Sequence, residues 1–219
     1  MSLFALVQSM LDGLAVTLFL TAGGSLVAIV LAWLAGLARL STLRAVRVAA
    51  AVYVEVFRGT SALVQLYWFF YALPLLGVHL SPLVTGVAVL GLNTGAYGAE
   101  VVRGAVVSIG RDQREAAVAL NMTGLQQLWL VIMPQALLRM LPPAGNLLIE
   151  LMKATALVSL ITLSDLTFRG MILRAQTLDT VRVFGLLLLI YFGIGQALMW
   201  GVRALERRVA GRWHMGRAS

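Results

Sequence analysis

The chain has 219 residues, of which 60% are hydrophobic and 12% charged, with a formal net charge of +8. A soluble globular domain carries roughly 25% charged residues. The low charged fraction of this chain therefore excludes a soluble globular domain and indicates a membrane protein. The chain has no cysteine, which excludes disulfides and thiolate chemistry. Its two histidines, His79 and His214, argue against a histidine-based metal site.

Long uncharged runs predict most of the transmembrane helices. Residues 14–38, 59–99 and 183–202 carry no charged side chain, whereas roughly 20 apolar residues suffice to cross a bilayer. The second run is too long for one helix, and the turn-forming residues Pro74 and Gly77 stand near its middle. We therefore divide this run into two spans.

A fifth span is predicted between Leu141 and Leu163, although Glu150 and Lys153 interrupt it. Side chains three residues apart share a helix face, and charges within a membrane are costly unless they face protein or water. We therefore expect an all-α integral membrane protein with a single domain over 1–219, five transmembrane helices and a basic tail over 206–219. The five spans are predicted at about 12–39, 50–76, 82–106, 141–164 and 183–205.

The arginines predict the orientation in the membrane. Sixteen of the seventeen basic residues are arginine; eleven of these arginines follow the first, third and fifth predicted spans, and three lie on the other side. Basic residues concentrate on the cytoplasmic side of membrane proteins. We expect a multi-pass protein of the bacterial inner membrane with a periplasmic N-terminus and a cytoplasmic C-terminus. No cleavable signal peptide is visible, so the first span is retained.

A polar cytoplasmic segment joins the third and fourth predicted spans, RDQREAAVALNMTGLQQLWLVIMPQALLRMLPPAGN at 111–146. Asp112 and Glu115 have the spacing of a capping box, which predicts the start of a short helix near Asp112. Asn121 is suited to a left-handed conformation at the end of that helix. A short exposed helix held between two spans can receive a push from a cytoplasmic partner.

Within this segment, EAAVALNMTGLQQLWLVIMPQA resembles the cytoplasmic signature loop of ABC importer permeases. Asn121 stands where that pattern has glycine, and asparagine also tolerates a positive φ angle. The alternative is that Glu115 is only a helix cap and the alanines only good helix formers. The positions that match the pattern are Glu115, Ala116, Ala117, Ile132 and Pro134.

The resemblance extends over residues 10–205, to the polar amino acid permeases. It rests on YVEVFRGTSALVQLYW at 53–68, AYGAEVVRGAVVSI at 96–109 and the stretch 134–168. Within this family, the chain is most similar to permeases for ectoine and hydroxyectoine in FRGTSALVQ with Ser61 and Ala62, in ALNMTG and in NLLIELMKATALVSLITLSDLTF. The amino-acid permeases usually have proline and leucine at 61–62, and aspartate at 154 where this chain has Ala154. The resemblance implies a path for a small zwitterionic solute such as ectoine or hydroxyectoine, with polar amino acid uptake as the alternative.

The resemblance also implies partners. The chain lacks the G-x-x-x-x-G-K-[ST] phosphate loop, so we expect no enzyme activity and no cofactor on it. ATP and Mg²⁺ are expected on a separate ABC ATPase subunit. A periplasmic solute-binding protein and a second permease, homologous or identical, complete the expected assembly. The basic tail is expected to contact membrane lipid rather than nucleic acid, since it abuts a span and lacks interleaved aromatics.

Three groups of residues are candidates for these roles. For Glu55 with Arg58, and for Glu150 with Lys153, an ion pair that only fixes packing is the alternative. Coupling to the ATPase is assigned to Glu115, Ala116, Ala117, Leu120, Asn121 and Gly124. The solute path is assigned to Asn146, Glu150, Lys153, Thr155, Ser159 and Asn93. A structural or hinge role is assigned to Glu55, Arg58, Gly59 and Pro134.

Two other classes of protein compete with this hypothesis. A membrane enzyme would need clustered histidine, cysteine or carboxylate side chains near one membrane face, and the sequence has no such cluster. A stand-alone channel would not need the cytoplasmic helix.

Overall fold

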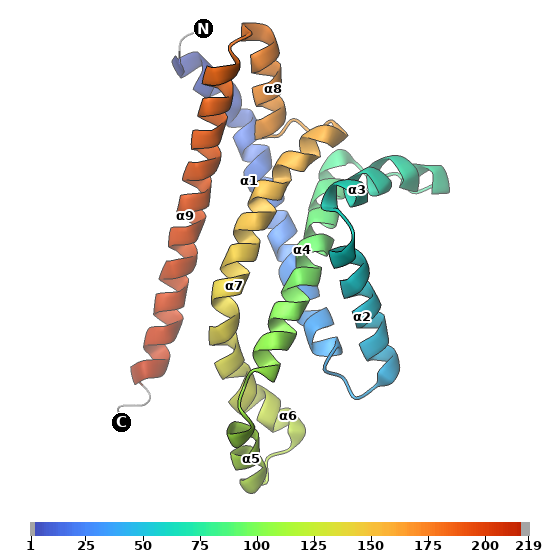
Figure 1. Cartoon of the computed structure of the whole chain (residues 1–219), viewed down its shortest axis with the longest axis vertical. Helices are drawn as coiled ribbons and strands as arrows, with labels where there is room; N and C mark the ends of the chain where they lie inside the picture. The colour runs from blue at the N-terminus through green and yellow to red at the C-terminus, as the bar shows by residue number, and fades with distance from the viewer. Residues whose placement is uncertain (1–2, 216–219) are drawn as a thin grey trace.

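The computed structural model describes residues 3–215, and every regular element in that range is helical (Figure 1). This confirms the all-α prediction. The α-helices are α1 (Leu3–Ala38), α2 (Arg44–Gly59), α3 (Ala62–Tyr67), α4 (Pro82–Val107), α5 (Arg111–Ala119), α6 (Gly124–Gln126), α7 (Met133–Ala154), α8 (Leu166–Thr177) and α9 (Thr180–Met215). Stretches of π-helix cover Trp68–Ala72 and Gln127–Ile132, and 3₁₀-helix covers Leu73–Leu76 and Thr155–Ile161.

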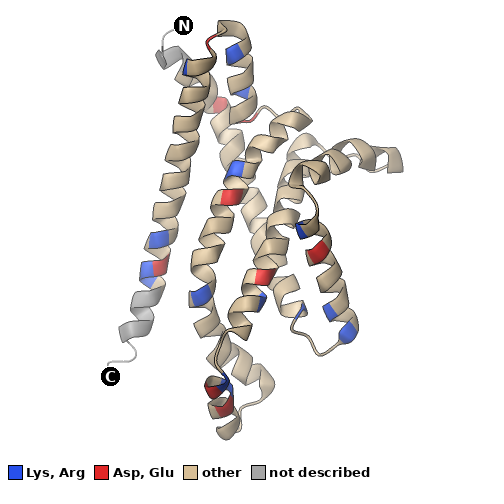
Figure 2. Cartoon of the chain, in the orientation of Figure 1, with Lys and Arg blue, Asp and Glu red and all other residues tan. Residues whose placement is uncertain are grey.

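The long helices α1, α4, α7 and α9 run along the long axis of an elongated bundle (Figure 1). The short helices α5 and α6 lie at one end of it, here called the α5 end, and α8 lies at the other, the α8 end. Basic residues are more numerous toward the α5 end (Figure 2). α1 alone has 36 residues, a length of about 54 Å, which exceeds the thickness of a bilayer core.

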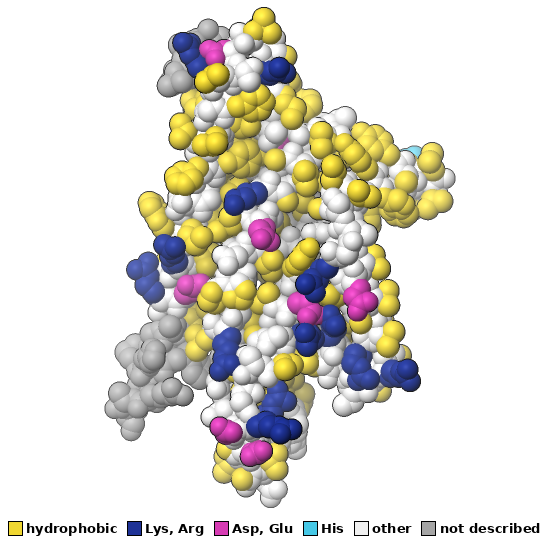
Figure 3. All heavy atoms as spheres, in the orientation of Figure 1, with side chains coloured by type: hydrophobic (Ala, Val, Ile, Leu, Met, Phe, Trp, Pro, Cys, Tyr) yellow, Lys and Arg dark blue, Asp and Glu magenta, His cyan; other side chains and the backbone are white. Residues whose placement is uncertain are grey.

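Three helical stretches are long and apolar enough to cross a membrane, namely Val7–Ala38, Gly124–Ile161 and Thr180–Val209. α2 and the helical stretch 62–76 add a fourth if they are counted as one span. Much of the visible surface is apolar (Figure 3), as expected of a surface that faces lipid. The structure thus supports three to four apolar spans, and the number five stays a prediction.

The predicted second span, 50–76, is wrong as one straight helix, because α2 and the following helical stretch meet at 102°. The turn expected near Gly77 is present: this glycine has φ +87° and closes the 3₁₀ turn before α4 begins at Pro82.

The remaining spans differ from the predicted ones mainly at their ends. The helix predicted from 141 begins at Gly124 and passes through Pro142 and Pro143 without a break, and its α-helical part ends at Ala154. α1 begins well before residue 12, and α9 continues through the predicted tail to Met215; residues 216–219 lie outside the described part of the chain. Hydropathy locates the apolar middle of a helix, whereas backbone hydrogen bonds decide where it ends.

The central contact is a close approach of α1 and α4 that depends on glycine. A Cβ on Gly91 would lie 2.6 Å from Cβ and Cγ1 of Val27, and one on Gly98 would lie 2.7 Å from Cβ of Ala32. Both distances are far below the normal carbon contact of about 3.5–4.0 Å. Small residues allow backbones to approach in this way inside membranes.

A buried carboxylate joins three helices at the α8 end. Asp165 is fully buried and caps α8, where its carboxylate oxygens accept hydrogen bonds from the backbone N–H groups of Thr167 (3.2 Å) and Phe168 (2.9 Å). The hydroxyl of Tyr191 on α9 donates to it at 3.5 Å, and Thr17 on α1 accepts from the next backbone N–H at 3.2 Å. Burial raises the pKa of the Asp165 carboxyl above its ordinary value, although these hydrogen bonds oppose that effect.

Substituting alanine for Gly91 should destabilise the bundle, because the added methyl group overlaps Val27. Overpacking of this kind costs about 1–3 kcal/mol. Thermal unfolding of the purified chain in one detergent measures the effect as a lower midpoint. Gly104→Ala on the same helix is the matched control, since nothing lies within 4 Å of a Cβ there. Equal midpoints for the two variants would show that the close approach is not required.

Candidate functional site

α5 begins one residue earlier than the sequence predicts, at Arg111 after Gly110, and no side chain caps it. The capping box predicted for Asp112 and Glu115 is therefore wrong, because Asp112 already lies inside the first turn. A capping box forms instead at α6. The Thr123 hydroxyl accepts from the backbone N–H of Gln126 at 3.4 Å, and the Gln126 side-chain oxygen accepts from the backbone N–H of Thr123 at 2.8 Å.

The end of α5 has the geometry predicted for Asn121, whose φ is +57°. The backbone N–H of Asn121 donates to the carbonyl of Val118 at 2.9 Å, and that of Met122 donates to the carbonyl of Ala117 at 3.1 Å. These two bonds form a Schellman motif, which normally favours glycine at the left-handed residue. Asn121 thus adopts the left-handed backbone conformation that this turn requires.

Side-chain hydrogen bonds hold α5 against the ends of α4 and α7. Arg114 donates to the carbonyl of Val106 at 3.0 Å, and Gln135 donates to the side-chain oxygen of Gln113 at 3.1 Å. Arg139 of α7 donates to the carbonyl of Ser108, in the linker before α5, at 2.6 Å. A short helix tied to both long helices moves with them as one body.

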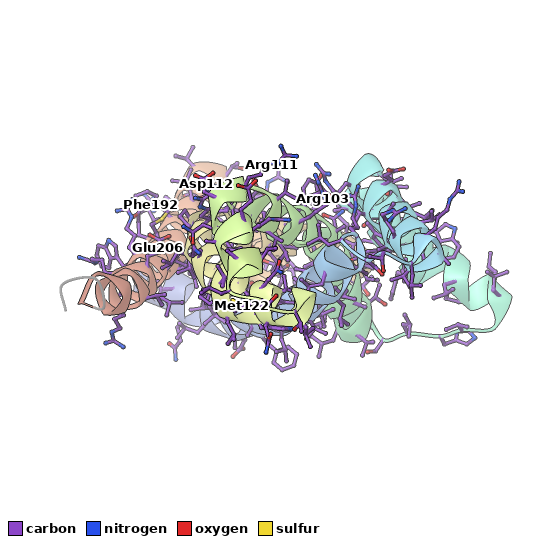
Figure 4. All side chains as sticks on the ribbon, turned by 90° about the horizontal axis from the view of Figure 1, so that it is seen from below. Arg103, Arg111, Asp112, Met122, Phe192 and Glu206 are labelled. Atoms are coloured by element: carbon purple, nitrogen blue, oxygen red, sulfur yellow. The ribbon has the colours of Figure 1, made fainter. Side chains whose placement is uncertain are left out.

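Ala117 is the buried residue of α5, at 2% exposure. Leu120 points outward at 75% exposure. Viewed from the α5 end, α5 lies across the end of the bundle, with Arg111 and Asp112 at one end and Met122 at the other (Figure 4). The other assigned coupling residues are also exposed, namely Glu115, Ala116, Asn121 and Gly124.

Exposed apolar side chains near Leu120 in the sequence are not among the residues that match the signature pattern. Val118 is 60% exposed, and Leu125 and Trp129 are also exposed. We call these three residues and Leu120, all exposed apolar side chains near the α5 end, the α5 surface. An amphipathic reading of 118–130 could have marked these residues, because apolar side chains recur in it between polar ones.

Five of the six assigned path residues divide into two groups. Asn146, Glu150 and Lys153 are exposed along α7, at the four- and three-residue spacings of one helix face. Thr155 and Ser159 are buried in the 3₁₀ stretch and donate to the carbonyls of Met152 and Ala156, both at 2.7 Å. The sequence grouped them by α-helical spacing, which fails because α7 tightens after Ala154.

Glu150 and Lys153 do not form the packing ion pair that the sequence left open. The ion pairs among the described residues are Arg39–Glu100, Arg103–Glu100, Arg169–Asp12 and Arg182–Asp179. Charged side chains lie among the apolar ones on this face of the molecule (Figure 3). Two unpaired charges on a helix within the membrane are stable only where protein or water faces them.

Asn93, the remaining path candidate, belongs to a hydrogen-bond network at the break between α2 and α3. Its amide donates to the carbonyl of Phe57 at 2.9 Å and to the side-chain oxygen of Gln65 at 3.2 Å. Gln65 is buried and donates to Phe57, and to the Thr60 hydroxyl at 2.7 Å. A helix that ends inside a membrane leaves carbonyl groups without partners, and these side chains supply the partners.

Three of the four residues assigned a structural or hinge role, Glu55, Arg58 and Gly59, lie at or near this break. Arg58 stacks over the ring of Tyr97, with 5.2 Å from its guanidinium carbon to the ring centre, and the exposed Glu55 is not its ion-pair partner. Gly59 has no positive φ, and nothing lies within 4 Å of a Cβ there. The bend lies instead at Thr60 and Ser61, which have extended backbones, so glycine's conformational freedom is not what creates it.

Pro134 lies in the first turn of α7, directly after the π-helical stretch. The N–H of Met133 donates to the carbonyl of Leu128 in this π-turn. Because proline has no N–H, it leaves a carbonyl of the preceding turn without its usual partner. Pro134 therefore marks the junction of the α5–α6 region with α7 and does not end the helix.

A further ionic contact that the sequence did not predict ties the α5 ends of α1 and α4. Glu100 accepts hydrogen bonds from Arg39, which follows α1, and from Arg103, whose Nη2 lies 2.8 Å from Oε2. The contact restrains the end of α1 against α4, directly above the linker that leads into α5.

The fold and the anchored helix at the bundle end define a membrane-embedded transport subunit. Residues 24–211 match the family described as "Binding-protein-dependent transport system inner membrane component", and the chain belongs to this family. It is therefore an inner-membrane, multi-pass permease component of a binding-protein-dependent ABC importer.

Named relatives cover most of the chain. A probable amino-acid ABC transporter permease, y4tF of Sinorhizobium fredii, is 48% identical over 81% of this chain and 77% of its own. The glutamine transport system permease GlnP of Escherichia coli is 35% identical over 91% of this chain and 92% of its own. A crystal structure of an amino acid ABC transporter with histidines superposes with a TM-score of 0.88 at 30% identity, over 95% of this chain and 99% of its own.

Replacing Gln65 with leucine should destabilise the break between α2 and α3. The change leaves the Thr60 and Phe57 oxygens with fewer partners, and buried polar groups without partners cost about 1–3 kcal/mol each. The measurement is the thermal midpoint of the purified chain, together with proteolysis at residues 59–62. Gln196→Leu is the matched control, because Gln196 is exposed on α9. If both variants melt like the unaltered chain, the network does not hold the break.

Proposed function

We propose that this chain is the permease subunit of an ABC importer for polar amino acids. The observation that carries the proposal is the exposed, unpaired charges of Glu150 and Lys153 near the C-terminal end of α7. An amino acid carries one ammonium and one carboxylate at neutral pH. A site that holds one carboxylate and one ammonium at helix spacing can complement both groups of such a solute.

Amino acids fit the comparisons better than ectoine does. The relatives reported above that are named for a solute are named for amino acids, as is the L-cystine permease TcyB of Bacillus subtilis, which is 37% identical over 78% of this chain and 73% of its own. The prediction of ectoine or hydroxyectoine as the solute rested partly on Ser61, Ala62 and Ala154. Ser61 and Ala62 lie at the α2–α3 break and Ala154 ends α7, so these residues also serve backbone geometry.

The path itself would be completed by a second permease, identical or homologous. α7 exposes Asn146, Glu150 and Lys153 on a face that no part of the described chain covers. Charges there are stable only against protein or a water-filled path. A pair of such subunits, each contributing this face, encloses the charges between them.

Energy would reach the path through α5. An ABC ATPase subunit that binds ATP and Mg²⁺ docks on the α5 surface and draws the two copies of α5 together as it closes. Because α5 is hydrogen-bonded to α4 and α7, its movement rocks these helices as rigid bodies, which opens the path to alternate sides.

The proposed orientation places the α5 end in the cytoplasm and the N-terminus in the periplasm. Arg44, Arg111 and Arg203 are among the many basic residues toward the α5 end, whereas Arg169, Arg174 and Arg182 belong to α8 and the start of α9. A periplasmic solute-binding protein would deliver the amino acid at the α8 end.

Uptake by the reconstituted assembly tests the solute. The permease, its ATPase and its binding protein in liposomes should import polar amino acids and leave ectoine and hydroxyectoine outside. Lys153→Met should reduce that uptake about tenfold or more through loss of one charged partner, with assembly unchanged. Arg174→Met, at the α8 end, is the control for removing a charge. Import of ectoine alone would discard the amino acid assignment, and full uptake by the Lys153 variant would remove Lys153 from the path.

Co-purification tests the coupling surface. Leu120→Glu places a charge in the exposed apolar α5 surface, and burying it unpaired against an ATPase is costly. We expect about tenfold less ATPase retained on the tagged permease, without a change in the thermal midpoint. Leu178→Glu is the matched control, because Leu178 is 85% exposed at the α8 end. Equal retention by the two variants would place the ATPase contact elsewhere.

A further inference from the structure

Arg58 is a charged residue far along a helix that enters the membrane. α2 begins with Arg44 toward the basic α5 end and carries Arg58 in its last turn (Figure 1). The two residues are therefore separated by about 21 Å along the helix, within an apolar layer about 30 Å thick. Residues 59–99, which follow, carry no charge. An exposed ionisable residue at such a depth faces protein or water, and it is by default a candidate functional residue.

Tyr97 of α4 fixes the direction of the Arg58 side chain. The guanidinium carbon lies 5.2 Å from the centre of the Tyr97 ring, and the Tyr97 hydroxyl donates to the carbonyl of Arg58 at 3.4 Å. A cation over the face of an aromatic ring is attracted to it but keeps its charge. No ion pair among the described residues includes Arg58, so the ring positions a guanidinium that no carboxylate of this part of the chain neutralises.

The acid nearest to Arg58 in the sequence, Glu55, lies on another side of α2. The rings of Tyr53 and Phe57 lie 5.3 Å apart on one face of the helix, and the Tyr53 hydroxyl donates to the carbonyl of Leu92 on α4 at 2.8 Å. Residues two apart on a helix do not share a face. Glu55, two residues from both rings, therefore points away from α4 and from the guanidinium over it.

The acid nearest to Tyr97 on α4 is already neutralised. Glu100 lies one turn beyond Tyr97, and its carboxylate forms ion pairs with Arg39 and Arg103. Two cations on one carboxylate leave a net positive charge. The part of this face formed by the end of α2 and by α4 thus has an excess of positive charge beside Arg58, which suits an anionic group from outside the chain.

We propose that Arg58, positioned by Tyr97, binds a side-chain carboxylate of the solute, so that the importer favours a dicarboxylic amino acid. The inference rests on the proposed function, in which Glu150 and Lys153 complement the ammonium and the α-carboxylate. Charged side chains lie over α7 and over the neighbouring α2–α4 region on one face of the molecule (Figure 3). Two cations and one acid match one ammonium and two carboxylates, and a guanidinium can hold a carboxylate through two parallel hydrogen bonds.

Equilibrium binding to the permease–ATPase assembly in nanodiscs, without the binding protein, tests this assignment. The probes are glutamate and glutamine, which have nearly the same shape and differ in the charge of the side chain. The unaltered assembly should bind glutamate roughly tenfold or more tightly than glutamine, and Arg58→Gln should abolish that preference. Arg174→Gln at the α8 end is the matched loss of charge and should keep the preference. Equal weakening of both solutes by Arg58→Gln would assign Arg58 a structural role only and overturn the proposal.

Tyr97 is a positioning residue in this proposal and has its own test. Tyr97→Leu removes the ring under the guanidinium and should lower the preference for glutamate roughly threefold, whereas Tyr97→Phe keeps the ring and should retain it. Equal changes in the two variants would contradict a role for the ring. If the unaltered assembly binds glutamine as tightly as glutamate, the role of Arg58 is wrong and amino acid import stands. Binding of neither solute, together with no amino acid uptake, would overturn the proposed function as well.

Discussion

The contact between α1 and α4 is the constraint on which the rest of this structure depends. Gly91 and Gly98 on α4 leave no room for a side chain against α1. In a membrane the two helices gain little from hydrophobic association, since lipid is as apolar as they are, so their contact depends on close packing. This packing makes α1 and α4 one unit, and α7 packs against it on the way from the α5 end to the α8 end.

The same unit makes the broken span possible. Once α4 is held against α1, Asn93 and Tyr97 are placed beside the end of α2, where they donate to the carbonyls of Phe57 and Arg58 at 2.9 and 3.4 Å. Gln65 completes the set from the other side of the bend. A chain can turn by 102° inside an apolar environment only when the carbonyls at the turn have such donors. The bend is therefore a property of three helices and not of Gly59.

Side-chain hydrogen bonds attach α5 to the long helices on both sides of it. α5 is fastened by side chains from both directions, through Arg114 to α4 and through Gln135 to α7. The Glu100 contacts restrain the end of α1 in the same region. α5 is therefore connected by a hydrogen bond to α7, the helix that carries Glu150 and Lys153. By contrast, only 11% of the most apolar stretch of α9 is buried, and its buried residues Val183 and Leu187 pack at the α8 end.

Composition and short-range pattern alone determined the helical class, the apolar middles of the spans, the turn at Gly77 and the left-handed Asn121, because these follow from side-chain chemistry and local backbone preference. Tertiary structure decided what depends on partners distant in the sequence. Asn93 is a donor to the carbonyl of Phe57 on α2, and Thr155 is buried because α7 tightens after Ala154. Asn93 donates to a carbonyl at the end of α2, where the helix itself supplies no further N–H partner. The pattern of residue types along the chain does not specify which distant side chain will reach that carbonyl.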